Sequence, residues 1–174
     1  GKAIPPTPAV GAVGLIPDVS VRAGFGGMKE GQVLLCVGET QGQLGASLYL
    51  RHIEGDDDGA PPGVDLEVEK RNGDFVRGQI RSGRARIVHD ISDGGLACAA
   101  AEMAIASGVG VKLAHEGQVE LFAWAFGEDQ ARYLIAADGA DAEAILKAAK
   151  SADIPAMAVG LVGGDQLTLN AQHA

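Results

Sequence analysis

The sequence has few aromatic residues: Phe, Trp and Tyr make up 4% of its 174 residues, whereas apolar residues as a whole make up 47%. The core of the fold must therefore be built mainly from Ala, Val, Leu and Ile. A chain of 174 residues has the length of one domain, or of one domain with part of another.

Basic residues are also scarce. The chain has 14 Lys and Arg against 23 Asp and Glu, which gives a formal net charge of −9. An acidic surface repels nucleic acids and anionic membranes, and the sequence has no basic cluster of the kind that a nucleic-acid reader needs. We therefore expect neither of these partners. A phosphate-bearing ligand would need a local device, such as backbone amides, a few arginines or a bound divalent cation.

Cysteine is limited to Cys36 and Cys98, and each lies in an apolar run without a second Cys or a His at metal-ligand spacing. Buried, reduced thiols in a cytoplasmic protein are the favoured interpretation, and a disulfide is the alternative. The sequence has no stretch long and apolar enough to span a membrane and no signal peptide. The opening residues GKAIPPTP, which lack Met, indicate a fragment of a longer protein.

Short apolar runs alternate along the chain with segments of helical period. Apolar runs bounded by Gly, Pro or polar residues predict strands over residues 10–16, 32–39, 85–90, 111–114, 131–138, 155–164 and 166–170. Apolar residues spaced by three and four predict helices over residues 42–53, 64–82, 92–107, 119–126 and 141–152. This alternation predicts an α/β or α+β fold in which helices cover a mixed sheet.

Two loop segments interrupt this pattern. The glycine-rich residues 21–31 (VRAGFGGMKEG) separate the first predicted strand from the rest and indicate a domain boundary. Residues 54–63 (EGDDDGAPPG) form an acidic loop without EF-hand spacing. A solvated surface loop is therefore favoured there over a cation site.

The segment HDISDGGL, residues 89–96, is the most informative part of the chain, because a strand runs through a short turn directly into a helix. Ser92 is the expected N-cap, with Asp93, Gly94 and Gly95 at the first three helical positions. A capping box would place Glu or Gln where Gly95 stands. The glycines leave the amides of residues 94 and 95 open to a phosphate, which the helix dipole also favours. The alternative is an ordinary tight turn in which Asp93 complements the dipole.

Two further residues of this segment could carry chemistry. Asp90 and Asp93 could share a magnesium ion that bridges to the phosphate, or they could repel an anion. His89 stands at the end of the predicted strand, where a satisfied structural histidine is favoured over a catalytic base.

Glu128 and Asp129, in the segment FGEDQARY, form a second candidate cluster. Paired acids can hold Mg²⁺ or transfer protons, although capping and solvating a turn is the commoner role. Arg132 could pair with one of them. Asn72 and Gly73 are a third candidate, because they interrupt an otherwise apolar helix face. Close contact between helix and sheet explains them, as would contact with a ligand or another domain.

Five segments together resemble the large synthetase subunit of phosphoribosylformylglycinamidine synthases, in the same order along the chain. They are GKAIPPTPAVGAVGLIPDV, QLGASLYL, VDLEVEKRNGDFVR, HDISDGGLACAAAEMA and FGEDQARYLI. HDISDGGL and FGEDQ are the most specific of them. Similar glycine-rich turns occur in a wider superfamily that includes aminoimidazole ribonucleotide synthetase, selenophosphate synthetase and thiamine-monophosphate kinase.

The resemblance implies an architecture. That family has two ATP-binding-type domains and two C-terminal-type domains, arranged as an internal duplication. Residues 1–28 would be the tail of the preceding ATP-binding-type domain with a linker, and residues 29–174 would be the final C-terminal-type domain. The family's fold for this domain has three layers, α/β/α, with a mixed sheet like that of the aminoimidazole ribonucleotide synthetase C-terminal domain.

The resemblance also implies an activity. The family uses ATP and Mg²⁺ to convert formylglycinamide ribonucleotide and glutamine-derived ammonia into formylglycinamidine ribonucleotide, a step of purine biosynthesis. No position of this chain matches the family's catalytic or metal-binding motifs, so we expect no catalytic residue here and an inactive isolated fragment. The turn Ser92–Gly95 corresponds to the strand-to-helix turn that faces the ligand cleft in this domain type.

The partners implied are the remaining domains of the synthetase and a glutaminase component, together with self-association through exposed apolar surface. Two alternatives remain open. The chain could be a fragment of a sister enzyme such as aminoimidazole ribonucleotide synthetase, or a non-catalytic phosphate-binding or assembly module.

Overall fold

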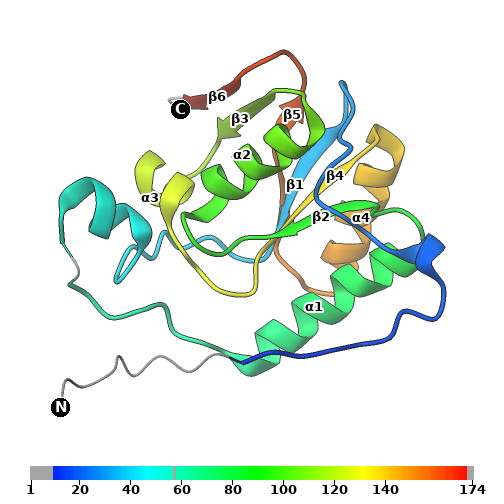
Figure 1. The fold of residues 1–174 in the computed structure, drawn as a ribbon, viewed down its shortest axis with the longest axis horizontal. Helices are drawn as coiled ribbons and strands as arrows, with labels where there is room; N and C mark the ends of the chain where they lie inside the picture. Colours follow the sequence, from blue (N-terminus) through cyan, green and yellow to red (C-terminus); the bar gives the residue numbers. More distant parts are fainter. Residues whose placement is uncertain (1–9, 57, 172–174) are drawn as a thin grey trace.

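A six-stranded mixed sheet forms the centre of the protein (Figure 1). The computed structural model describes residues 10–56 and 58–171. In spatial order the strands are β2 (Ile87–Asp90), β4 (Tyr133–Ala137), β1 (Val33–Val37), β5 (Ala156–Val162), β3 (Val111–His115) and β6 (Leu167–Ala171). Neighbouring strands are antiparallel except β3 and β6, which run parallel.

Helices cover both faces of this sheet. The helices α1 (Leu66–Arg81) and α4 (Gly139–Ser151) pack on one face, and α2 (Gly95–Ser107) and α3 (Leu121–Phe126) pack on the other. The prediction of a three-layer α/β/α arrangement with a mixed sheet is therefore confirmed.

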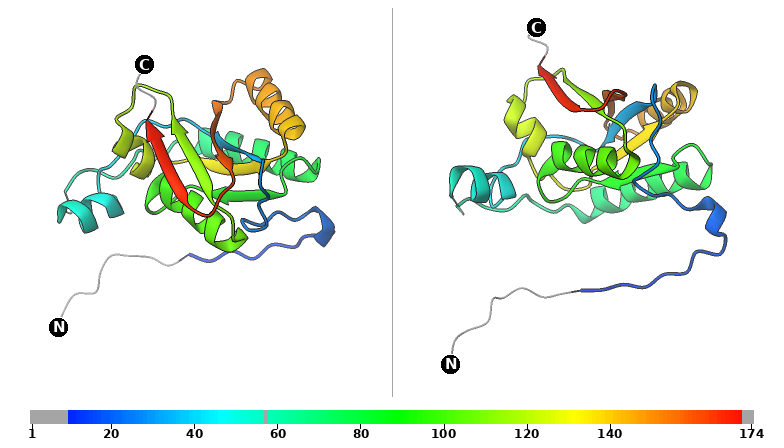
Figure 2. Two further views of the ribbon diagram at one scale, coloured as in Figure 1. Left: turned by 90° about the horizontal axis from the view of Figure 1, so that it is seen from above. Right: turned by 45° about the horizontal axis from the view of Figure 1, so that its top comes forward.

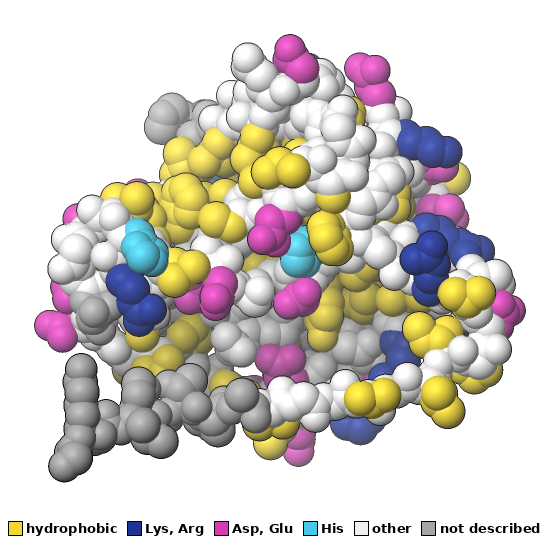
Figure 3. Space-filling model, in the orientation of Figure 1, with side chains coloured by type: hydrophobic (Ala, Val, Ile, Leu, Met, Phe, Trp, Pro, Cys, Tyr) yellow, Lys and Arg dark blue, Asp and Glu magenta, His cyan; other side chains and the backbone are white. Residues whose placement is uncertain are grey.

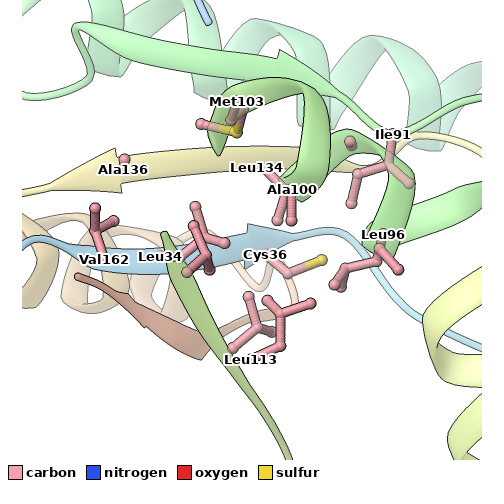
Figure 4. Close-up of a cluster of buried hydrophobic side chains, with 14 of the residues drawn as sticks. Leu34, Cys36, Ile91, Leu96, Ala100, Met103, Leu113, Leu134, Ala136 and Val162 are labelled. Atoms are coloured by element: carbon pink, nitrogen blue, oxygen red, sulfur yellow. The ribbon is translucent and has the colours of Figure 1, made fainter. Parts of the chain in front are cut away.

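The sequence of the central strand β1 is a continuous apolar run because both faces of the strand are buried. Successive side chains of a strand point to opposite faces. Leu34 and Cys36 contact the cluster under α2, which Figure 4 shows, whereas Leu35 and Val37 contact the cluster under α1 and α4. Because both faces are covered, every second position must be apolar on each side.

Helix α1 begins at an N-cap, Asp65, whose Oδ1 accepts hydrogen bonds from the amides of Glu67 at 2.9 Å and Val68 at 3.1 Å. Its buried face carries Val76 together with two polar side chains, Asn72 and Gln79. The predicted polar interruption of an apolar face is thus present in the structure.

The predicted strand over residues 10–16 is wrong. These residues have no strand structure, and their apolar side chains are exposed, with Val13 at 101% of its reference surface. Figure 2 shows residues 10–20 lying outside the packed layers of sheet and helices. A strand needs a neighbour to pair its backbone groups, and no described strand pairs with residues 10–16. The isolated bridge from Gly24 to Ile87 lies after this segment.

Three smaller expectations also change. Of the predicted helix over residues 42–53, the structure forms only a short turn that includes a π-helix at Leu50–Glu54. Cys98 is exposed rather than buried, because it points away from the core face of α2, while Cys36 is buried as expected. Both thiols are free, so the disulfide alternative is wrong.

The surface agrees with the acidic composition. The face in Figure 3 carries acidic side chains interspersed with apolar ones, and Lys and Arg side chains gather on its right-hand side. Among the helices of the described residues, none has the length and apolar character needed to cross a membrane.

Candidate functional site

Three loops meet at one edge of the sheet and enclose most of the predicted site residues. They are residues 38–48 after β1, residues 91–95 between β2 and α2, and residues 127–132 between α3 and β4. Since β4 is antiparallel to both β1 and β2, the C-terminal ends of those two strands and the start of β4 lie at the same end of the sheet. We call this set of residues the loop junction.

The Glu128 carboxylate connects all three loops. Its Oε1 atom accepts one hydrogen bond of 2.8 Å from the amide of Leu48 and another of 2.8 Å from the amide of Gly94. The backbone of Glu128 adds a third link, because its amide donates to the carbonyl of Gln43 at 2.8 Å. A half-buried carboxylate that accepts two backbone amides is a strong, charge-assisted anchor.

Asp129 performs the same task for the first loop. Its two carboxylate oxygens accept the amides of Gly42 at 3.0 Å and Gln43 at 3.1 Å, and the residue is 5% exposed. Its charge is balanced by Arg132, whose Nη1 lies 3.5 Å from Asp129 Oδ2. The prediction that Arg132 pairs with one of the two acids is confirmed.

Arg132 is itself buried, and its guanidinium N–H groups donate hydrogen bonds within the loop junction. Its guanidinium donates to the carbonyls of Gly127 at 2.6 Å and Asp129 at 3.1 Å and to the hydroxyl of Thr40 at 3.1 Å. Burial lowers the pKa of Arg132, and the negative charge of Asp129 opposes that shift. The pair therefore holds the loops in place, the commoner of the two roles expected for these acids.

The turn Ser92–Gly95 differs from its prediction. Ser92 is not the N-cap: α2 begins at Gly95, and its cap is Gly94, in a left-handed conformation with φ of 76°. The amide of Gly95 donates to the carbonyl of Ser92 at 3.0 Å, and the amide of Gly94 donates to Glu128. A carboxylate from a distant loop thus does the capping that sequence assigned to the local serine. Ser92 and Asp93 are exposed.

Close packing explains why Gly95 is glycine. A Cβ atom at this position would lie 2.6 Å from the carbonyl oxygen of Gly127 and 2.7 Å from the carbonyl carbon of Phe126. Its φ of 71° also falls in the region that glycine adopts most easily. The turn therefore needs glycine for the approach of the chain that follows α3, whether or not a ligand binds there.

His89 and Asp90 lie at the end of β2, next to the junction. His89 Nε2 is 2.7 Å from Glu102 Oε2 and its Nδ1 is 3.3 Å from Asp90 Oδ1, while the ring centroid lies 5.0 Å from that of Phe25. These contacts accord with a satisfied structural histidine. The described residues contain no group of three or more His, Cys, Asp or Glu that could hold a metal ion, so we assign no magnesium ligand to Asp90, Asp93 or their neighbours.

Asn72 joins helix α1 to the junction. Its Nδ2 donates to the carbonyl of Ala131 at 3.0 Å, and Ala131 itself has a left-handed φ of 58°. A Cβ atom on the adjacent Gly73 would lie 3.2 Å from the hydroxyl of Tyr133. Close contact between helix and sheet, the simpler of the two explanations, accounts for both residues.

Apart from the Gly94 amide, sequence reasoning missed the groups that these acids bind, because the partners are backbone amides. Leu48, Gly42 and Gln43 donate through the main chain, so their residue types carry no signal. Gly42 is the one of these three whose residue type fits its position. It has a left-handed φ of 78° and approaches Ala123 closely, and both features favour glycine.

A cleft of about 290 Å³ lies beside the junction. Its lining includes the acidic residues Glu39, Asp65 and Asp129, and it does not include the Ser92–Gly95 turn. A cleft with this much negative charge and no lysine or arginine in its wall disfavours a bare phosphate.

The comparisons with known proteins point to one family. Residues 29–170 match the family described as "AIR synthase related protein, C-terminal domain". The phosphoribosylformylglycinamidine synthase subunit PurL of Parvibaculum lavamentivorans is 54% identical over 172 residues, which cover 98% of this chain and 23% of that protein. The same subunit of Caulobacter vibrioides is 56% identical over 165 residues, covering 95% of this chain and 22% of that protein. The chain thus spans about a quarter of the length of these relatives.

Solved structures share the fold. Thermotoga maritima PurL complexed with FGAR has a TM-score of 0.72 at 18% identity and covers 89% of this chain and 27% of its own. The structure of PurLQS from the same organism has a TM-score of 0.68 at 16% identity, with 89% and 26% covered. T. maritima PurL complexed with ATP has a TM-score of 0.67 at 16% identity, with 89% and 25% covered.

Proposed function

The chain belongs to the family of AIR synthase related proteins, as a C-terminal domain, and from this premise we propose that it is the final C-terminal-type domain of a phosphoribosylformylglycinamidine synthase. The observation that carries the proposal is the match of nearly the whole chain to one part of the PurL relatives. The parent enzyme would be an ATP-dependent carbon–nitrogen ligase with glutamine as amide donor, acting in cytoplasmic purine biosynthesis.

The chemistry of that reaction lies outside this domain. Phosphoryl transfer depends on metals and amides positioned on the transferred oxygens, and ATP and Mg²⁺ would supply this in the parent enzyme. The described residues provide no metal-binding cluster. The domain therefore contributes a wall of the ligand cleft and a surface for assembly with the remaining domains and the glutaminase component, and the fragment alone is inactive.

Within this role, the turn Ser92–Gly95 faces the ligand cleft of the assembled enzyme but is closed by Glu128. The carboxylate occupies the position on the Gly94 amide that a phosphate oxygen would take. An anion can bind Gly94 only after Glu128 has released it. This arrangement favours a structural turn in this repeat over a working phosphate site.

A domain exchange tests the function. The matching segment of the C. vibrioides PurL relative is replaced by residues 1–174, and formation of the amidine from ATP, ammonia and the ribonucleotide is measured. We expect the hybrid to retain activity within about tenfold of its parent, because close relatives share the packing against neighbouring domains. The chain alone should show no amidine formation, and detectable turnover by pure chain contradicts the scaffold role.

The same exchange separates the alternatives. A folded hybrid that is inactive, together with an active hybrid of an aminoimidazole ribonucleotide synthetase, identifies the chain as part of the sister enzyme. Tight binding of inorganic phosphate by the chain alone would favour the stand-alone phosphate-binding module.

A further inference from the structure

A second cavity opens at the sheet edge where β1 and β3 end and β5 begins. Its volume is about 340 Å³, and its wall includes His115, Trp124 and Met157. None of its lining residues belongs to the Ser92–Gly95 turn. A cavity of this size is at the small end of the range for small-molecule sites, which suits a ligand of one or two fused rings.

His115 is the unusual residue of this wall. The side chain is buried, with 7% of its surface exposed, yet its Nε2 atom has no hydrogen-bond partner among the described residues. Buried polar atoms nearly always have a partner, since an unpaired one destabilises the fold. An imidazole nitrogen can donate or accept according to its tautomer, so a ligand with adjacent N–H and ring-nitrogen groups can satisfy it in either state.

The rest of the wall defines the chemistry of such a ligand. The ring of Trp124 lies against His115, with centroids 5.0 Å apart and planes inclined at 59°, and Met157 adds a thioether. These groups favour a flat aromatic ring. Glu39 and Glu116 also line the cavity and bring negative charge. They repel anions and accept hydrogen bonds from amino groups.

Gly117 lies next to the Nε2 atom of His115. A Cβ atom at Gly117 would lie 3.6 Å from His115 Nε2, which is an ordinary contact distance, and its φ is outside the left-handed region. Because residue 117 is glycine, no side chain of that residue stands between Nε2 and a ligand.

We propose that this cavity binds a small amino-substituted nitrogen heterocycle, neutral or cationic, through His115 Nε2 and the face of Trp124. The site is separate from the turn assigned to the parent enzyme's cleft. Two features of the cavity favour this class of ligand. One is the unpaired, buried imidazole nitrogen, and the other is a wall that combines an aromatic ring with acidic residues.

The test is a titration of the isotope-labelled chain with 2-aminobenzimidazole, followed by the indole N–H signal. Trp124 is the single tryptophan of the sequence, so this signal reports the cavity without ambiguity. We expect saturable shifts of the Trp124 indole and of the Gly117 amide. Indole-2-carboxylate, which is anionic, should give no saturable shift of these signals.

Three variants assign the interaction to its residues. His115→Phe keeps a ring against Trp124 but removes the nitrogen, and should weaken binding at least about tenfold. Gly117→Val, which fills the approach, should abolish it. Gln79→Met is the control, since Gln79 Oε1 is also buried without a partner but lies on α1 outside the cavity.

Any of three results overturns the proposal. The first is the absence of a saturable shift at Trp124 in the folded chain. The second is equal binding by wild type and His115→Phe, and the third is equal binding of plain indole, because in both cases the cavity would recognise apolar surface rather than the heterocycle.

Discussion

Two backbone amides from different loops converge on one oxygen of the Glu128 carboxylate. Replacing Glu128 by Ala leaves the amides of Leu48 and Gly94 without their partner. We expect the free energy of unfolding to fall by about 2 kcal/mol, because half-buried donors lose charge-assisted hydrogen bonds. Urea unfolding followed by circular dichroism measures the change.

Glu143→Ala is the matched control, since Glu143 is exposed on α4. Its stability should stay within about 0.5 kcal/mol of wild type. Hydrogen exchange adds a local readout, in which the Gly94 and Leu48 amides of Glu128→Ala exchange faster than those of wild type. Unchanged exchange at both amides would show that the hydrogen bonds of Glu128 do not hold these loops.

Cys36 gives a prediction for alkaline pH. Burial raises the pKa of its thiol from 9.0 to about 11, against the smaller opposing effect of the Arg132 charge. Well below pH 9.0 the thiol is protonated in both states. Between pH 9.0 and about 11 only the unfolded chain loses the proton, so the free energy of unfolding falls as pH rises through this window.

We expect Cys36→Ala to show a shallower fall of stability across this window than wild type, when urea unfolding is compared at successive pH values. The slope is the relevant quantity, because the smaller side chain also lowers stability at every pH by leaving a cavity. Cys98→Ala should keep most of the slope, since Cys98 is exposed. Equal slopes in wild type and Cys36→Ala would contradict the assignment.

At the scale of elements, the start of α2 depends on glycine for two separable reasons. Gly95 has a φ of 71°, and a Cβ there would overlap the backbone of residues 125–127. Gly108, at the other end of α2, has a similar φ of 66° but open space around it. Gly108→Ala should therefore cost about 1 kcal/mol from backbone strain alone.

Gly95→Ala should cost about 3 kcal/mol or more, because steric overlap with the backbone adds to the same strain. Thermal unfolding of the two variants side by side checks the difference. Similar losses in both would mean that the chain after α3 can move aside, and that the close approach does not require glycine.

Apart from the helix expected over residues 42–53, the sequence predicts the strands and helices after residue 30 well, because most of them are covered by other parts of this same chain. β1 reads as a buried run since helices cover both faces. The prediction fails at residues 10–16, where an apolar pattern has no neighbouring strand among the described residues. It also fails at Ser92, because the local pattern for a cap cannot show that Glu128, 36 positions later in the sequence, reaches the same amide.

At the scale of the whole molecule, apolar surface is left uncovered. Met157, Leu161 and Leu167 on the last two strands are 48%, 54% and 40% exposed, and residues 10–19 add further exposed apolar side chains. Large exposed apolar patches mark interaction surfaces. We expect the chain to self-associate, with a mass in light scattering that rises with concentration.

Leu161→Asp should reduce this association, because it places a charge on the exposed sheet surface. Ser151→Asp, on the exposed end of α4, serves as the control. A monomeric mass for wild type over a wide concentration range would contradict the expectation.

The closure of the Ser92–Gly95 turn by Glu128 is the central claim, and an amide-shift titration tests it most directly. Formylglycinamide ribonucleotide and Mg-ADP are added separately to the isotope-labelled chain and to Glu128→Ala. We predict no saturable shift of the Gly94 amide in wild type, and a saturable shift in the variant, whose Gly94 amide is free. A saturable Gly94 shift in wild type would contradict the claim, because the turn would then be a working phosphate site with Glu128 in place.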